Sequence, residues 1–127
     1  METYIIAIAT LIAYFGAKTL LINDLSKDSA RNMIREGAVV IDVRSEDEYQ
    51  NAHIETAVNI PLNEISSKIG AVAGDKNKVI LLHCRSGSRS FIGKRILKRM
   101  NYRNVYNLGS FGRAERMVMN EKNDRNI

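Results

Sequence analysis

The sequence predicts an α/β fold with a mainly parallel central sheet flanked by helices. Strand-type apolar runs alternate along the chain with helical patterns, as expected when parallel strands are joined by crossover helices. The runs over 38–43 and 78–83 are apolar on both faces, which is typical of buried parallel strands. A length of 127 residues with 45% hydrophobic and 26% charged residues is ordinary for one compact domain.

An apolar helix over residues 1–22, followed by a linker over 23–27, is the first predicted element. The stretch 4–22 carries a single charge, Lys18, and about 20 apolar residues can cross a bilayer. We therefore expect a single-pass membrane anchor that contacts lipid through residues 4–22. A cleaved signal peptide and a buried core helix are the alternatives. An acidic start at Glu2 and the lack of a suitable small-residue cleavage site disfavour the signal peptide.

Charges on either side of this stretch predict its orientation. Lys18, Lys27 and Arg31 lie at or beyond its end, and Glu2 precedes it. The positive-inside rule then places the globular part in the cytoplasm. A periplasmic or exported domain is the alternative.

Start and stop signals mark the helices of the globular part. Either Ser26 or Asp28 can cap the first of them. Ser45 and Glu48 have the spacing of a capping box, which predicts the second, and Gly70 can stop the third. A fourth helix has an apolar stripe opposite a basic face. The four helices are expected over residues 26–37, 45–52, 62–70 and 90–100.

Four apolar or β-branched runs predict the strands. These are expected over residues 38–43, 57–60, 78–83 and 104–108. After the last strand we expect one or two helical turns over 113–119 and then a frayed polar tail. The globular domain is thus predicted over 28–113, and the C-terminal turn and tail over 114–127.

Cys84, the only cysteine of the chain, follows directly on the most apolar strand. In parallel sheets ligands bind outside the carboxyl ends of the strands. The loop after Cys84 can turn its backbone N–H groups inward, and the helix from about Ser90 aims its positive end at the same point. Together with Arg85 and Arg89 these groups stabilise a thiolate, which predicts an activated nucleophile. The alternative is that Cys84 is a buried filler residue.

Two segments together resemble a single-domain rhodanese, which is a sulfurtransferase: IDVRSEDEYQNAHIETAVNIP over 41–61 and CRSGSRS over 84–90. The resemblance covers roughly residues 26–112. It implies a rhodanese-like fold with a five-stranded parallel sheet. It further implies that Cys84 takes a sulfane sulfur from thiosulfate or a protein persulfide, becomes a persulfide and passes the sulfur to a thiophilic acceptor. No external cofactor is implied.

The same resemblance implies roles for residues around Cys84. Arg89 and the loop amides are expected to bind the persulfide or the anionic donor. The full set of expected substrate-binding residues is Arg85, Ser86, Gly87, Ser88, Arg89 and Ser90. Asp42 and Arg44, which point to one side of a strand end, are expected to tie loops together near the site. His53 is expected to form structural hydrogen bonds.

Three positions depart from the family pattern. Ala52, Thr56 and Ser110 stand where the family usually has glycine. Ser110 belongs to the expected wall of the active-site loop, where a Cβ narrows the pocket. The resemblance therefore leaves the donor preference open.

Spacing and composition weigh against other functions. Cysteine phosphatases have five residues between cysteine and arginine, whereas four separate Cys84 from Arg89. A small phosphatase or arsenate reductase therefore ranks below sulfur transfer, and a non-catalytic module that binds an anion or a persulfide is the other alternative. His53 and His83 lack the spacing of metal ligands, so no metal site is expected. Despite a net charge of +5, no aromatic platform for nucleic acid accompanies the basic residues.

Overall fold

The four strands of this protein form one parallel sheet between two layers of helices. The structure is a computed structural model that describes residues 1–22 and 25–125. The strand order is β2-β1-β3-β4, and all three pairings are parallel. The strands are β1 (Val39–Asp42), β2 (Val58–Asn59), β3 (Val79–His83) and β4 (Asn104–Gly109). The α/β class and the parallel sheet flanked by helices are confirmed.

The sheet differs from the prediction in its number of strands. Within residues 1–22 and 25–125 it has four strands, so the expected fifth is wrong. Only four runs of the sequence have a strand pattern, and the fifth strand was implied by the family resemblance alone. Three of these strands fall within the predicted runs, and β4 continues one residue beyond its run, to Gly109.

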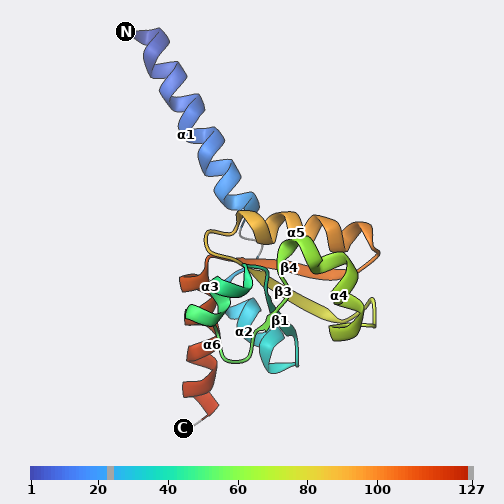
Figure 1. Cartoon of the computed structure of the whole chain (residues 1–127). Helices are drawn as coiled ribbons and strands as arrows, with labels where there is room; N and C mark the ends of the chain where they lie inside the picture. Colours follow the sequence, from blue (N-terminus) through green and yellow to red (C-terminus); the bar gives the residue numbers. More distant parts are fainter. Residues whose placement is uncertain (23–24, 126–127) are drawn as a thin grey trace.

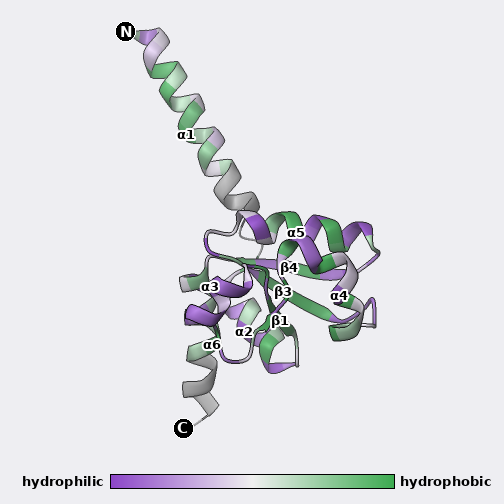
Figure 2. Ribbon diagram, viewed as in Figure 1, coloured by the Kyte–Doolittle hydropathy of each residue, from purple (hydrophilic) through white to green (hydrophobic). Residues whose placement is uncertain are grey.

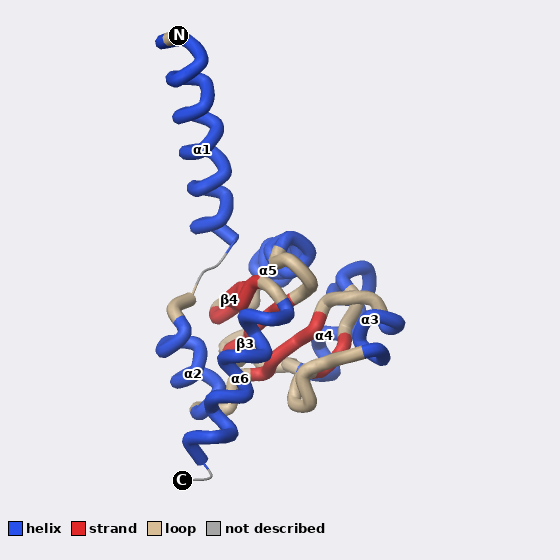
Figure 3. Tube along the Cα trace, turned by 90° about the vertical axis from the view of Figure 1, so that its left-hand side faces the viewer, coloured by secondary structure: helices blue, strands red, loops and turns tan. Residues whose placement is uncertain are grey.

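Helices cover both faces of the sheet (Figure 3). They are α2 (Lys27–Arg35), α3 (Glu46–Asn51), α4 (Ile65–Val72), α5 (Ser88–Arg99) and α6 (Phe111–Arg125), with the 3-10 turn η1 (Leu62–Glu64) before α4. Neighbouring strand residues face opposite layers: Ile41 packs in the cluster that includes residues of α4 and α5, and Val40 packs in the cluster with α2 and α6. This alternation follows from the period of two in a strand, and it explains why both faces are apolar.

Local signals fix the helix starts as the sequence predicts. Ser26, rather than Asp28, is the N-cap of α2 and accepts a hydrogen bond from the Ser29 N–H. Ser45 and Glu48 form both arms of the capping box of α3. At the other end of the chain α6 runs to Arg125. The expectation of one or two turns and a frayed tail is therefore wrong.

The N-terminal helix α1 (Glu2–Ile22) leads away from the sheet (Figure 1). Apolar colour runs along much of it in Figure 2, and large side chains such as Ile5 and Ile12 are 64% and 66% exposed. No helix among the described residues is both long and apolar enough to span a bilayer, so the predicted anchor and its lipid contact are not supported.

Candidate active site

Cys84 lies at the carboxyl end of β3, in the loop that opens α5. Its side chain is fully buried. The Gly87 N–H donates a hydrogen bond to Sγ at 3.0 Å, and the Ser90 hydroxyl lies 3.5 Å from Sγ. Gly87 has φ +99°, a left-handed conformation that residues with a Cβ rarely adopt. This turn directs the loop amide inward at the sulfur.

The surroundings of Cys84 favour its thiolate. Burial raises the pKa of the Cys84 thiol, but hydrogen bonds from the Ser90 hydroxyl and from backbone N–H groups of the loop together bring the pKa below its ordinary value. The contributing N–H groups are those of Ser86, Gly87 and Ser90. Full burial alone would also fit a filler cysteine. A filler residue, however, has no need of converging donors, so these contacts favour a working sulfur.

Asn107 on β4 holds the Cys84 loop through hydrogen bonds, and this role was not predicted from the sequence. It is fully buried. Its Oδ1 accepts hydrogen bonds from the Ser90 hydroxyl at 2.7 Å and from the Gly109 N–H at 2.9 Å. Its Nδ2 donates to the Gly87 carbonyl at 3.0 Å. The available signal was an amide within an otherwise apolar strand, since a buried amide needs partners.

The register of β4 brings Gly109 beside the loop. A shift in the β3–β4 pairing follows Leu82, so that His83 lies opposite Gly109. Gly109 has φ +92°, and its carbonyl accepts the Cys84 N–H at 3.2 Å. Its neighbour Ser110 pairs with Ser86 in an isolated antiparallel bridge. The wall and the loop are thus joined through backbone contacts.

Asp42 and Arg44 form a buried ion pair beneath the site. Asp42 is fully buried and Arg44 is 6% exposed. The Arg44 Nε and Nη2 donate to the Asp42 carboxylate at 3.0 and 2.8 Å, and Nη2 also donates to the Ala52 carbonyl at 2.6 Å. The guanidinium carbon lies 4.5 Å from the centre of the Phe111 ring. The pair therefore links β1, the end of α3 and the start of α6.

Neither of the two histidines forms a hydrogen bond with Sγ in the structure. His83 is fully buried, with Nε2 3.7 Å from the Asp42 carboxylate, and burial lowers its pKa, which favours the neutral ring. His53 is exposed; its Nδ1 lies 2.8 Å from the Tyr49 carbonyl and its ring stacks on the Tyr49 ring at 3.9 Å. His53 thus packs against α3, as its expected structural role implies.

Arg89 turns toward α3. Its Nη1 and Nη2 donate to the Glu48 carboxylate at 2.6 and 3.0 Å. The Arg89 hydrogen bond lowers the Glu48 pKa to about 2, even though burial opposes the shift. The role of Arg89 in binding a donor stays a prediction, because its guanidinium is already hydrogen-bonded to the Glu48 carboxylate.

The other loop residues face solvent. Arg85, Ser86 and Ser88 are exposed, and the Ser86 and Ser88 hydroxyls lie 3.2 Å apart. Arg85 lines a pocket of about 330 Å³ together with Arg44, Glu48, Asn51, Ala52 and Phe111. Whether these side chains contact a substrate stays a prediction.

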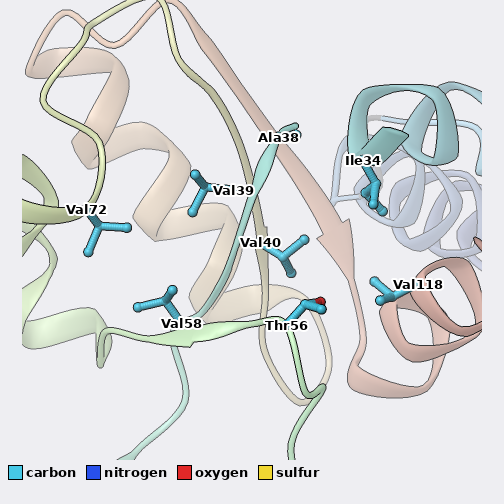
Figure 4. Close-up of a pocket in the computed structure, with 8 residues that line it drawn as sticks. All are labelled: Ile34, Ala38, Val39, Val40, Thr56, Val58, Val72 and Val118. Atoms are coloured by element: carbon cyan, nitrogen blue, oxygen red, sulfur yellow. The ribbon is translucent and has the colours of Figure 1, made fainter. Parts of the chain in front are cut away.

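An apolar pocket of about 440 Å³ lies at the opposite end of the sheet (Figure 4). Val39 and Val58, the first residues of β1 and β2, line it. Val40, Val118 and other small or aliphatic side chains complete the lining. Its position at the amino ends of the strands separates it from Cys84.

Comparisons with known proteins agree with this geometry. The family description "Rhodanese-like domain" matches residues 26–112. The thiosulfate sulfurtransferase PspE of Escherichia coli is 41% identical over 69 residues, which cover 54% of this chain and 66% of PspE. The chain spans 66%, 25% and 38% of the lengths of three curated relatives that it matches.

Two solved structures share the fold. A structure described as rhodanese with anions, from E. coli, has a TM-score of 0.59 and 36% identity, with 61% of this chain and 91% of that chain covered. The human single-domain sulfurtransferase TSTD1 has a TM-score of 0.58 and 23% identity, with coverage of 69% and 88%. The domain match, which takes in both β1 and the Cys84 loop, shows that this chain belongs to the rhodanese-like family.

Proposed function

We propose that this chain is a sulfurtransferase that carries sulfane sulfur as a persulfide on Cys84. One observation carries the proposal: the N–H of Gly87 and the hydroxyl of Ser90 converge on a fully buried Sγ. Donors that favour a thiolate also favour a persulfide anion, because both place negative charge on sulfur within the same turn. The thiosulfate sulfurtransferase activity named for PspE supports the same reaction class.

The reaction has two displacement steps. First, the Cys84 thiolate attacks the outer sulfur of thiosulfate, the sulfur–sulfur bond of thiosulfate breaks, and sulfite leaves with the electron pair. Second, a thiophilic acceptor attacks the terminal sulfur of the persulfide, and the Cys84 thiolate leaves. A protein persulfide can replace thiosulfate, in which case a thiolate leaves in the first step. The chain supplies the nucleophile and the donors around it.

Access to the sulfur requires a change in the loop. Cys84 has no exposed surface in the described conformation, and the backbone bridge between Ser86 and Ser110 joins the loop to its wall. Donor entry therefore requires a movement that exposes Sγ. The location of the domain relative to a membrane depended on the predicted anchor, and cytoplasmic placement stays a prediction.

Mass spectrometry of the intact protein tests the proposal. After incubation with thiosulfate and removal of small molecules, wild type is expected to gain the mass of one sulfur atom, and Cys84→Ser is expected to gain none. Subsequent cyanide should return the wild-type mass and release thiocyanate. Absence of the added sulfur with thiosulfate and with a protein persulfide would contradict the proposal. A module that only binds anions would show this absence while still binding thiosulfate.

A further inference from the structure

We propose that Glu48 selects sulfur donors by charge, disfavouring doubly charged donors such as thiosulfate relative to singly charged ones of the same size. The inference rests on the proposed sulfur transfer and concerns how strongly the site binds donors of different charge. Arg89, the cation of the loop that the resemblance links to donor binding, is held by the Glu48 carboxylate through two hydrogen bonds of 2.6 and 3.0 Å. A doubly charged donor therefore meets a cation that is already neutralised.

The position of Arg89 ties this ion pair to the sulfur. Arg89 lies in the chain between Gly87 and Ser90, and both of these residues contact Sγ. The Glu48 hydrogen bond is the largest cause that raises the Arg89 pKa, burial opposes it, and the charges of Glu48 and Cys84 raise the pKa further. A change in charge at Arg89 is consequently felt at the reacting atom.

Glu48 also faces the second loop arginine. It lines the pocket of about 330 Å³ to which Arg85 and Arg44 contribute. Arg44 is neutralised by Asp42, and no described residue forms an ion pair with Arg85 within 4.0 Å. Arg85, Arg89 and Glu48 together carry one net positive charge instead of the two that the arginines alone would carry. Glu48 therefore weakens the attraction for a dianion about twice as much as the attraction for a monoanion.

The carboxylate is fixed in place and ionised. Both side chains of the pair are about one-third exposed, at 35% for Arg89 and 31% for Glu48. The Ser45 N–H and hydroxyl donate to Glu48 Oε1 at 3.3 and 3.1 Å, as part of the capping box of α3. With a pKa of about 2, Glu48 is charged at every physiological pH. A fixed charge repels a dianion about twice as strongly as a monoanion at the same distance.

Two donors of nearly equal size separate charge from shape. Thiosulfate carries two negative charges, and methanethiosulfonate replaces one charged oxygen with a methyl group and carries one. Both have an outer sulfur that Cys84 can accept; the leaving groups are sulfite and methanesulfinate, each departing with the electron pair of the broken sulfur–sulfur bond. The rate of persulfide formation on Cys84, followed by mass spectrometry at varied donor concentration, yields KM and the limiting rate for each donor.

The informative variant is Glu48→Gln. Glutamine removes the charge but keeps the capping-box geometry, because glutamine serves at this position of the motif. We expect KM for thiosulfate to fall about 10-fold and KM for methanethiosulfonate about 3-fold, since the effect on a dianion is the square of that on a monoanion. Asp47→Asn is the matched control: it removes one negative charge from the same first turn of α3 at an exposed position, and both KM values should stay within about 2-fold.

Arg89→Gln provides a test of opposite sign. With the cation removed and Glu48 left charged, KM should rise for both donors and more steeply for thiosulfate. Equal changes for the two donors in both variants, or no change in Glu48→Gln, would overturn the inference and leave the proposed function intact. Failure of wild type to form a persulfide with either donor would instead overturn the proposed function.

Discussion

The two ends of the parallel sheet are built from opposite chemistry. At the carboxyl end, Asp42, Asn107 and Cys84 are fully buried polar or nucleophilic residues, each with hydrogen-bond partners. At the amino end, Val39 and Val58 line an apolar pocket. The same four strands therefore hold a polar network at one end and a hydrocarbon surface at the other. Substitutions at the polar end should therefore change chemistry or stability, whereas substitutions at the apolar end should change stability alone.

The largest effect on stability is expected from the ion pair at the polar end. Arg44→Ala leaves the fully buried Asp42 carboxylate without its guanidinium partner. An uncompensated buried charge costs about 3–5 kcal/mol, so the midpoint of chemical denaturation should fall sharply. The double variant Asp42→Asn, Arg44→Met removes both charges and should lose less. A loss below about 1 kcal/mol in Arg44→Ala would show that water reaches Asp42 and that the pair is not a structural link.

An intermediate effect is expected at Asn107. A substitution at this residue of the polar end should change the pKa of the Cys84 thiol. Asn107→Leu removes the support of Ser90 and of the Gly87 carbonyl. Since hydrogen bonds from this loop lower the Cys84 pKa, their loosening should raise it. The thiolate is lost as pH falls through the pKa, so the acidic limb of the rate profile should move to higher pH by about 1 unit, equal to about 1.4 kcal/mol.

Two measurements check this prediction: the pH dependence of Cys84 alkylation by a small reagent, and the pH profile of persulfide formation. Thermal unfolding of Asn107→Leu provides the control, because a buried polar group can also affect stability by about 1–3 kcal/mol. An unchanged pH profile in a folded variant would assign Asn107 to structure alone.

The smallest effect is expected at the apolar end. Val40 is 5% exposed and lines the apolar pocket. Val40→Ala removes two buried methyl groups and should cost about 1–2 kcal/mol in the free energy of unfolding. Persulfide formation at a temperature where the variant is folded should match wild type. A tenfold change in the rate of persulfide formation would show that the apolar end also affects the chemistry at Cys84.

The sequence predicted those features that depend on neighbours along the chain. The four strands, the Ser45–Glu48 capping box and the inward turn of the loop after Cys84 all arise from local spacing or local conformational preference. Helix α5 begins at Ser88, two residues before the expected start, which is the ordinary uncertainty of a helix end.

Features that depend on distant partners were not predicted. Asn107 meets Gly87 across 20 residues, and Arg89 meets Glu48 across 41 residues. No local pattern reveals which carboxylate an arginine selects, because that choice follows from the packing of α3 beside the loop. The fifth strand was wrong for another reason: it was taken from the resemblance alone.

Full burial of the lone sulfur has a consequence for oxidative damage. Peroxide converts exposed thiolates to sulfenic acids, which are rescued when a nearby thiol condenses with them. This chain has no second cysteine to serve as that partner. Its covering loop therefore limits oxidation while it is closed, and peroxide reaches Cys84 only during the opening that admits a sulfur donor.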